Sequence, residues 1–358
     1  MTPEATLARF REYMVGPTRF MNLLSCFELG IIDALRADPG MTAARIGEAV
    51  GVSPGSVEQL LILPVKEGFV TYDEDSGAYS LGAIADVPEA DLKRALAFMN
   101  MIKVVLLRQM FYLSESARAG SVVGLKEVYG FDGNLFGAVG ALKDVRDAWM
   151  GLAEVMTASV YPWFFGNVRL PTGARVLDVL GGNGLGAVMT QRLTASAQLR
   201  VTTFDRPEFE EECLRSFRDA GVSDRCSFVG GDVLEGMPAG FDVVMVKHFL
   251  DIFDKDEVLR IFRNANRSLE DGGELVILVA VYPEDLADPT DYQADFFPAF
   301  ILGGTIGRGG AQKVSTYRGW LKECGFEVTS VIDDDPSGLT PDAVLRRAIL
   351  RATKTATA

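Results

Sequence analysis

The chain has 358 residues, 48% of them hydrophobic, and a formal net charge of −14 at neutral pH. This length favours two domains with a substantial core. The acidic balance argues against nucleic acid or an anionic membrane as a partner, because phosphate groups are bound by basic surfaces. The longest apolar runs, such as Leu275 to Tyr282, are too short to span a bilayer, and the start of the chain shows no signal peptide.

Cysteine and histidine usage narrows the class further. The four cysteines contain no CxxC pair, so we expect free thiols in a reducing cytoplasm. The single histidine, His248, excludes a multi-histidine metal site, and we expect no metal.

Residues 1–85 predict a small winged-helix domain. Helices are expected over Thr42–Val50 and, from a Ser53 cap, to about Lys66. The alternating stretch Gly68–Leu81 predicts a hairpin, which forms the wing. DNA binding is disfavoured, because the second helix and the wing carry mostly acidic side chains.

A wide apolar stripe runs from Phe20 to Ile32 in the helical stretch 1–38. Such a stripe is either the core of the domain or a surface that another chain covers. We favour the second interpretation and expect a homodimer built on residues 1–85.

Residues 86–170 predict a helical region that follows the winged helix and lines a substrate pocket. Its aromatic and methionine side chains suit a flat apolar ligand, although most could equally be core. The expected wall combines residues of this region with others further along the chain: Phe111, Trp149, Met150, Phe253, Phe297, Phe300 and Ile301.

The stretch Ala174 to Thr190 organises the third region, residues 171–358. A buried parallel strand is expected over Arg175–Leu180 and a helix over Leu185–Leu193, with Gly181, Gly182 and Gly184 in the turn between them. Such a turn brings backbone N–H groups close to a ligand. The glycine spacing also fits a dinucleotide site, but Asp178 in the strand opposes a pyrophosphate and suits a cationic ligand such as S-adenosylmethionine.

Strands and helices alternate beyond this turn, which predicts an α/β fold with a doubly wound sheet. Strands are expected at Leu199–Phe204, Cys226–Val229, Phe241–Lys247, Glu274–Val281, Phe326–Ile332 and within Ala348–Ala352, and helices at Phe209–Ala220, Lys255–Ser268 and Tyr317–Cys324.

Polar residues follow several of these strands, where open α/β sheets bind ligands. Asp205 is placed to bind ribose hydroxyls, with Arg206 beside it; a helix cap is the alternative role for Asp205. Asp232 and Val233 suit the adenine amine and ring. Lys247, His248 and Asp251 follow the fourth strand and are expected at the reaction centre, although Asp251 could merely cap a helix.

Several motifs occur in an order that resembles the small-molecule O-methyltransferases of plant caffeate and bacterial polyketide type: VLDVLGGNG, FDRPEF, GGDVLEGMPAGFDVVMVKHFLDIFDKDE, LEDGGELVILV and LKECGF. The resemblance covers nearly the whole chain. It implies a winged-helix dimerisation domain, a class I S-adenosylmethionine domain and a small aromatic substrate. It also implies cofactor contacts by Asp178, Gly182, Asp205, Asp232, Val233 and Lys247.

The chain departs from that family where the base is expected. Asp251 stands in the position of the family histidine, and Val279 and Gln312 align near its two supporting glutamates. A carboxylate can still accept a phenol proton, particularly when burial raises its pKa. The stretch Ile301–Gly310 resembles that of ring C-methylating relatives, so we slightly favour carbon over oxygen as the methyl acceptor. The alternative is a protein of this fold that binds the cofactor but catalyses a cyclisation or rearrangement.

Overall fold

The computed structural model describes residues 2–194, 198–287, 293–333 and 346–355. The chain divides into two compact units, residues 1–100 and 101–358. This division has one boundary, whereas the sequence suggested a winged helix ending at 85 and a further boundary near 170.

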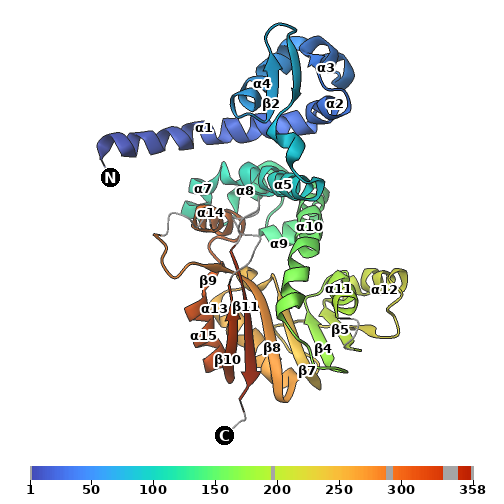
Figure 1. Ribbon diagram of the computed structural model, residues 1–358. Coiled ribbons are helices and arrows are strands. Elements are labelled where there is room, and N and C mark those ends of the chain that lie inside the picture. The colour runs from blue at the N-terminus through green and yellow to red at the C-terminus, as the bar shows by residue number, and fades with distance from the viewer. Residues whose placement is uncertain (1, 195–197, 288–292, 334–345, 356–358) are drawn as a thin grey trace. The chain divides into compact units, whose positions relative to one another are not determined.

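The first unit contains the elements that the sequence predicts (Figure 1). Its helices are α1 (Pro3–Glu28), α2 (Ile31–Ala37), α3 (Ala43–Val50), α4 (Pro54–Lys66) and α5 (Glu89–Met101), the last of which ends at the unit boundary. Three strands, β1 (Met41–Thr42), β2 (Val70–Asp73) and β3 (Ala78–Leu81), pair in the order β1-β3-β2. The Ser53 hydroxyl accepts a hydrogen bond from the backbone N–H of Ser56 and caps α4 as expected. The helix–turn–helix and its hairpin wing are thus confirmed.

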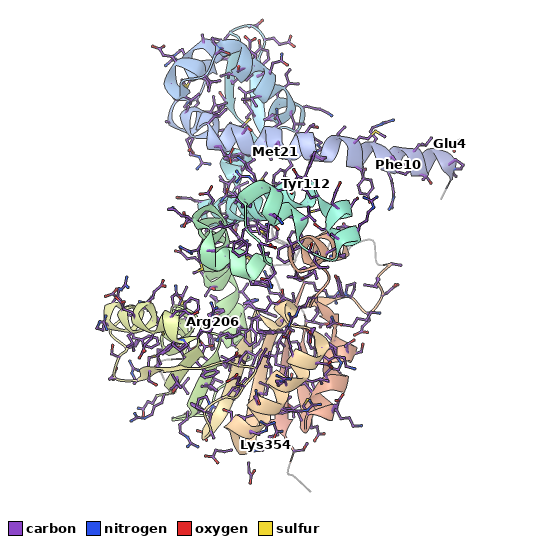
Figure 2. The ribbon with its side chains drawn as sticks, turned by 180° about the vertical axis from the view of Figure 1, so that it is seen from behind. Glu4, Phe10, Met21, Tyr112, Arg206 and Lys354 are labelled. Carbon is purple, nitrogen blue, oxygen red and sulfur yellow. The ribbon has the colours of Figure 1, made fainter. Side chains whose placement is uncertain are left out.

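The apolar side chains of α1 and the start of α2 are partly buried and partly exposed. Leu24, Cys26, Ile31 and Ile32 are at most 3% exposed and belong to the core of the unit. Leu29 of the stripe is 39% exposed, and the most exposed apolar side chains lie earlier in α1, at Leu7, Phe10, Tyr13 and Met14. Phe10 projects from the part of α1 that extends beyond the rest of its unit (Figure 2). The most exposed apolar surface of α1 therefore lies nearer the N-terminus than the stripe, and which of the two a partner covers stays a prediction.

Helices open the second unit. They are a π-helical turn, η2 (Ile102–Leu107), then α6 (Arg108–Met110), α7 (Leu113–Ala119), α8 (Val123–Tyr129), α9 (Leu135–Ala141) and α10 (Lys143–Asn167). No single helix within the described ranges is long and apolar enough to cross a membrane; one bent pair, Glu89–Met110 with Leu113–Ala119, meets the length and composition criteria together.

The sheet of the second unit has the order β10-β11-β8-β7-β4-β5-β6, with β9 paired to β8. Its strands are β4 (Arg175–Val179), β5 (Arg200–Asp205), β6 (Cys226–Gly230), β7 (Phe241–Lys247), β8 (Leu269–Tyr282), β9 (Gln312–Lys313), β10 (Phe326–Ile332) and β11 (Arg347–Lys354). From β4 the order runs outward in both directions, which confirms the doubly wound fold and places the switch point at β4. The sheet is mixed, because β11 runs antiparallel to both β8 and β10.

The helices α11 (Leu185–Leu193), α12 (Glu210–Asp219), α13 (Lys255–Ser268) and α15 (Val314–Glu323) pack on this sheet, with short 3-10 turns η4 (Pro207–Phe209) and η5 (Leu250–Ile252). The helix α14 (Gln293–Thr305) packs mainly on α6 and α7. The main core joins β4, β7, β8 and β11 to α13 and α15. A capping box of Asp254 and Glu257 begins α13, so the Lys255–Ser268 prediction holds to the residue.

Candidate active site

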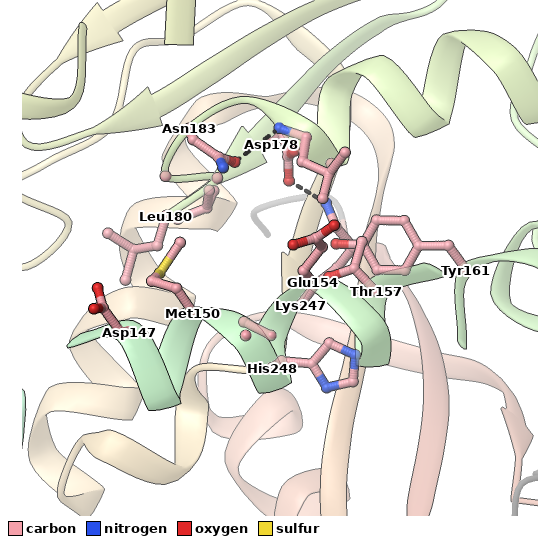
Figure 3. Close-up of a pocket in the computed structure, with 17 residues that line it drawn as sticks. Asp147, Met150, Glu154, Thr157, Tyr161, Asp178, Leu180, Asn183, Lys247 and His248 are labelled. Carbon is pink, nitrogen blue, oxygen red and sulfur yellow. Dashed lines mark hydrogen bonds and ion pairs between the residues drawn. The ribbon is translucent and has the colours of Figure 1, made fainter. Parts of the chain in front are cut away.

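A cavity of about 720 Å³ lies where α10, the turn after β4 and the end of β7 meet (Figure 3). Of the residues singled out in the sequence, it is lined by Met150, Asp178, Gly181, Gly182, Lys247 and His248. Ligands of doubly wound folds bind at this position, beyond the carboxyl ends of the strands at the switch point.

The glycine turn takes its shape from a tight backbone. Leu180 adopts a left-handed conformation (φ 50°), as does Gly182 (φ 54°). A Cβ on Gly186 would lie 2.6 Å from Oδ2 of Asp178, so a side chain there would displace the carboxylate. Gly184 has another role: its Cβ would collide with Phe217 and Cys213, which shows that it lets α11 pack closely on α12.

Asp178 and Lys247 form a buried ion pair at the base of the cavity. Oδ1 of Asp178 accepts from the Lys247 ammonium, and both side chains are at most 3% exposed. The ammonium also lies 5.6 Å from the centre of the Tyr161 ring, and burial together with the negative Asp178 raises the pKa of Tyr161 well above its usual value. Oδ2 of Asp178 has no hydrogen-bond partner among the described residues. A cavity wall with an unsatisfied carboxylate oxygen fits a ligand with a positive charge and N–H donors.

Asp205 is tied to the glycine turn. Its Oδ2 accepts from the backbone N–H of Gly182 at 2.8 Å, and its Oδ1 accepts from that of Arg206 at 2.7 Å. Burial raises the pKa of Asp205, while these two bonds oppose the rise. Asp205 does not cap a helix, because Arg206 occupies the N-cap position of η4. The Arg206 side chain is exposed and pairs with Glu208.

Asp232 and Val233 lie in the turn after β6. Oδ1 of Asp232 accepts from the backbone N–H of Leu234 at 2.8 Å. Val233 is 4% exposed and packs into the main core, and the Asn264 amide donates to its carbonyl at 2.8 Å. The main cavity is not lined by Asp205, Arg206, Asp232 or Val233.

His248 and Asp251 follow β7 and differ in their environment. His248 opens into the cavity from a left-handed backbone (φ 59°). His248 is exposed to solvent where the cavity opens, and partial desolvation by the surrounding protein, together with the positive charges of Arg347 and Lys247, lowers its pKa to about 3, so its imidazole is neutral at physiological pH.

Asp251 is half-buried in η5 and does not border the main cavity. Burial raises the pKa of Asp251 to about 6. Its carbonyl accepts from the backbone N–H of Gly310 at 2.7 Å, and a Cβ on Gly309 would lie 2.3 Å from that oxygen. The glycine loop before β9 therefore holds the Asp251 turn in place.

The two positions aligned with the family glutamates carry no carboxylate here. Val279 is fully buried in the main core, and the Gln312 amide donates to the Gly310 carbonyl at 3.2 Å. Among the described residues, Asp251 forms no ion pair. Burial raises the pKa of Tyr317, and the negative charge of Asp251 raises it further.

The residues expected to form an aromatic wall are divided by the structure. Trp149 stacks on Phe300, with 6.3 Å between ring centres, and Phe300 contacts the ring of Phe297. Phe253 packs against Phe249 beside the main core, and Ile301 borders a second cavity of about 330 Å³ near Gln312. Phe111 is 84% exposed and does not border either cavity.

One face of α10 was missed by the sequence analysis. It contributes Asp147, Glu154, Thr157 and Tyr161 to the cavity, together with Met150 (Figure 3). These residues recur at intervals of three and four, which places them on one side of a helix. The sequence shows this periodicity, but it does not show which element the shared face of α10 would pack against.

The doubly wound sheet, the glycine turn at its switch point and the adjoining cavity define a nucleotide-cofactor-binding α/β domain with a winged-helix domain before it. Comparison with known proteins gives the family. The O-methyltransferase domain family matches residues 113–327, and the O-methyltransferase dimerisation domain family matches residues 12–87. The chain belongs to the O-methyltransferase family, and it is an S-adenosylmethionine-dependent methyltransferase.

Its relatives include enzymes that methylate oxygen and carbon. The chain is 26% identical to the 3-amino-4-hydroxybenzoate 4-O-methyltransferase of Streptomyces cremeus, over 92% of this chain and 87% of that protein. It is 24% identical to the L-tyrosine C(3)-methyltransferase of Streptomyces lavendulae, over 93% and 90% respectively. The mitomycin 7-O-methyltransferase MmcR shares the fold with a TM-score of 0.79 at 20% identity, over 98% of each chain.

Proposed function

We propose that the protein methylates a small phenolic precursor of a natural product, on a ring carbon next to the hydroxyl or on the hydroxyl oxygen, with carbon slightly favoured. Two relatives that align along most of the chain are named for phenolic substrates, one methylated on oxygen and the other on carbon. The stretch Ile301–Gly310, which resembles that of C-methylating relatives, supports carbon.

The residues fit the cofactor on the evidence of Asp178, whose buried Oδ2 lacks a partner in the cavity wall. When bound, S-adenosylmethionine supplies an electrophilic methyl group on a sulfonium. We propose that Asp178, Gly181, Gly182 and Lys247 hold its amino-acid end and that Asp205 positions the turn against its ribose. Gly184, Arg206, Asp232 and Val233 would complete its surroundings.

The observation that carries the proposed chemistry is the pair of groups after β7. A general base works best when its pKa lies near the operating pH. With a pKa of about 6, Asp251 meets this condition, whereas His248, with a pKa of about 3, is too weak a base and can only accept a hydrogen bond. We therefore assign orientation of the hydroxyl to His248, which lines the cavity, and proton acceptance to Asp251, which lies three residues further along in η5, outside the cavity lining, so that the assignment requires the substrate hydroxyl to reach past His248.

Deprotonation raises the electron density on both the phenol oxygen and the ortho carbon. Asp251 would take the phenol proton, and the oxygen or the ortho carbon would then accept the methyl group that a cofactor held by Asp178, Gly181, Gly182 and Lys247 would supply. If carbon is the acceptor, Asp251 would return its proton to the oxygen and the ring proton would pass to the ionised Asp251 or to water, which restores aromaticity. The aromatic cluster of Trp149, Phe297 and Phe300 is the proposed wall for the ring, with Met150 at the cavity.

The test is turnover of Asp251→Asn, followed by S-adenosylhomocysteine formation and by product NMR, which assigns the methyl position. We expect wild-type kcat/KM to rise with pH through about 6, because Asp251 must be ionised to accept a proton. The variant keeps the shape but loses the basicity, and we expect a rate loss of about 10²–10⁴. Asp256→Asn removes an exposed carboxylate in the next helix and is the matched control. Wild-type turnover by Asp251→Asn from pH 6 to 9 would rule Asp251 out as the base.

We also propose that the protein is a cytoplasmic homodimer that associates through its N-terminal domain. The match to a dimerisation domain over residues 12–87 supports association. The exposed side chains Leu7, Phe10, Tyr13 and Met14 supply apolar surface for it. Light scattering at micromolar concentration should give twice the chain mass of 38.8 kDa, and the single-chain mass would refute the proposal.

A further inference from the structure

One side chain in the cavity has no place in the chemistry described so far. Glu154 projects from α10 into the cavity (Figure 3), and Thr157 lines the cavity one turn further along the same helix. Residues three apart on a helix are neighbours, so the carboxylate and the hydroxyl present their oxygens side by side. Together they form an acceptor site on the α10 side of the cavity.

The charges around the cavity are unequal. Three carboxylates line it, those of Asp147, Glu154 and Asp178, against one ammonium, that of Lys247. Asp147 pairs with Lys143, and Asp178 pairs with Lys247. Glu154 forms no ion pair with any residue that the structure describes. Glu154 is exposed to the cavity solvent, and the lysine that lines the cavity is already paired with Asp178, so the Glu154 carboxylate is accessible to a ligand.

A second observation points to a ligand with N–H donors. Asp178 is fully buried, lines the cavity and has an Oδ2 atom with no described partner. An unsatisfied buried carboxylate oxygen is costly, so a bound donor is needed to satisfy it. The cavity thus presents acceptors on two walls, Asp178 at the glycine turn and Glu154 on α10.

We propose that Glu154, assisted by Thr157, binds a primary amine on the aromatic substrate and selects amino-bearing phenols. The assignment rests on the proposed function. The Asp178 oxygen already serves the amino end of a cofactor bound at the glycine turn, so the separate acceptor on α10 is available to the other ligand. An aliphatic ammonium offers three donors and a ring amine two, and bonds from either to a carboxylate are charge-assisted.

The test is binding by calorimetry to protein saturated with S-adenosylhomocysteine, which requires no turnover. The probes are pairs with and without the amine: L-tyrosine with desaminotyrosine, and 3-amino-4-hydroxybenzoate with the same molecule lacking its amine. We expect wild-type protein to bind the amino member of at least one pair about tenfold more tightly, the range of a charge-assisted hydrogen bond.

Three variants test which carboxylate binds the amine of the substrate. Glu154→Gln should abolish the preference, Glu154→Asp should keep part of it, and Asp147→Asn, which removes a carboxylate from the same face, should leave it unchanged. The affinity for S-adenosylhomocysteine should not change in any of the three. Equal binding of both members of every pair, including no binding of either, overturns the proposal, as does a preference that survives Glu154→Gln.

A loss of S-adenosylhomocysteine affinity in Glu154→Gln, with the substrate preference unchanged, would assign Glu154 to the cofactor's amine instead and would also overturn the proposal. Failure of the proposed function looks different. In that case no phenol yields S-adenosylhomocysteine from S-adenosylmethionine, whatever the binding ratios show.

Discussion

The two walls of the cavity are built in different ways. The glycine-turn side joins the strand–turn–helix unit Asp178–Gly186 to the ends of β5 and β7, and its polar groups are tied within the protein: Asp178 to Lys247 and Asp205 to the backbone N–H of Gly182. The helix side of the cavity is the exposed face of α10, and the turn η5 with Asp251 lies outside the cavity lining. Glu154 and Asp251 form no ion pair with any described residue.

This difference suggests a division of roles. Groups that already have partners shape the site, and their loss affects folding or cofactor binding. Groups without partners are available to a ligand, and their loss affects recognition or rate. Substitutions on the two sides should therefore change different measured quantities.

Breaking the buried ion pair is expected to have the largest effect on stability. Lys247→Met leaves the Asp178 carboxylate buried and without a cation, which should lower the free energy of unfolding by about 3–5 kcal/mol. Denaturant titration measures this loss. Lys255→Met removes an exposed lysine at the start of α13 and should change stability little. A loss of less than about 1 kcal/mol in Lys247→Met would show that the pair does not support the glycine-turn side.

Removing the acceptor that holds the turn should have a smaller effect, on ligand affinity. Asp205→Ala releases the backbone N–H of Gly182 and removes a carboxylate from the proposed ribose site. Affinity for S-adenosylhomocysteine should fall by about 1–3 kcal/mol in calorimetry. Asp219→Ala, at an exposed position on α12, is the control. Unchanged affinity in Asp205→Ala would remove Asp205 from the cofactor site.

The smallest expected effect is a change in the pH dependence of stability. His248 has a pKa of about 3 in the folded chain against 6.5 unfolded, so the unfolded state binds more protons between these values and stability falls as pH drops below about 6.5. Asp251, raised from 3.8 to about 6, has the opposite sign and adds stability as pH falls through 6.

His248→Asn tolerates the left-handed backbone and removes only the first of these contributions. Between pH 7 and 5 its unfolding midpoint in urea should therefore fall less than that of the wild type. Asp251→Asn should show the reverse, a steeper fall. If the His248→Asn midpoint follows the wild type across this range, His248 titrates normally and is not held neutral by its surroundings.

The sequence by itself determined the elements and the glycine-turn side. The strand, turn and helix from Arg175 to Leu193 follow from apolar runs and glycine spacing, and α4 and α13 follow from their caps, because these signals act between residues a few positions apart. The same local reasoning identified the cysteines as free: all four are buried thiols. It also placed Lys247 at the cavity, since a parallel strand must end at the same edge of the sheet as its neighbours.

Tertiary structure decided what these elements meet. Lys247 reaches Asp178 across 69 positions of the chain, and the α10 face joins the cavity only because the helix crosses the end of the sheet. Phe111 resembles a pocket residue by composition but faces solvent, and half of the stripe from Phe20 to Ile32 is core. Helical periodicity fixes which residues share a face, whereas burial and charge pairing depend on contacts between distant segments, and these form only when the chain has folded.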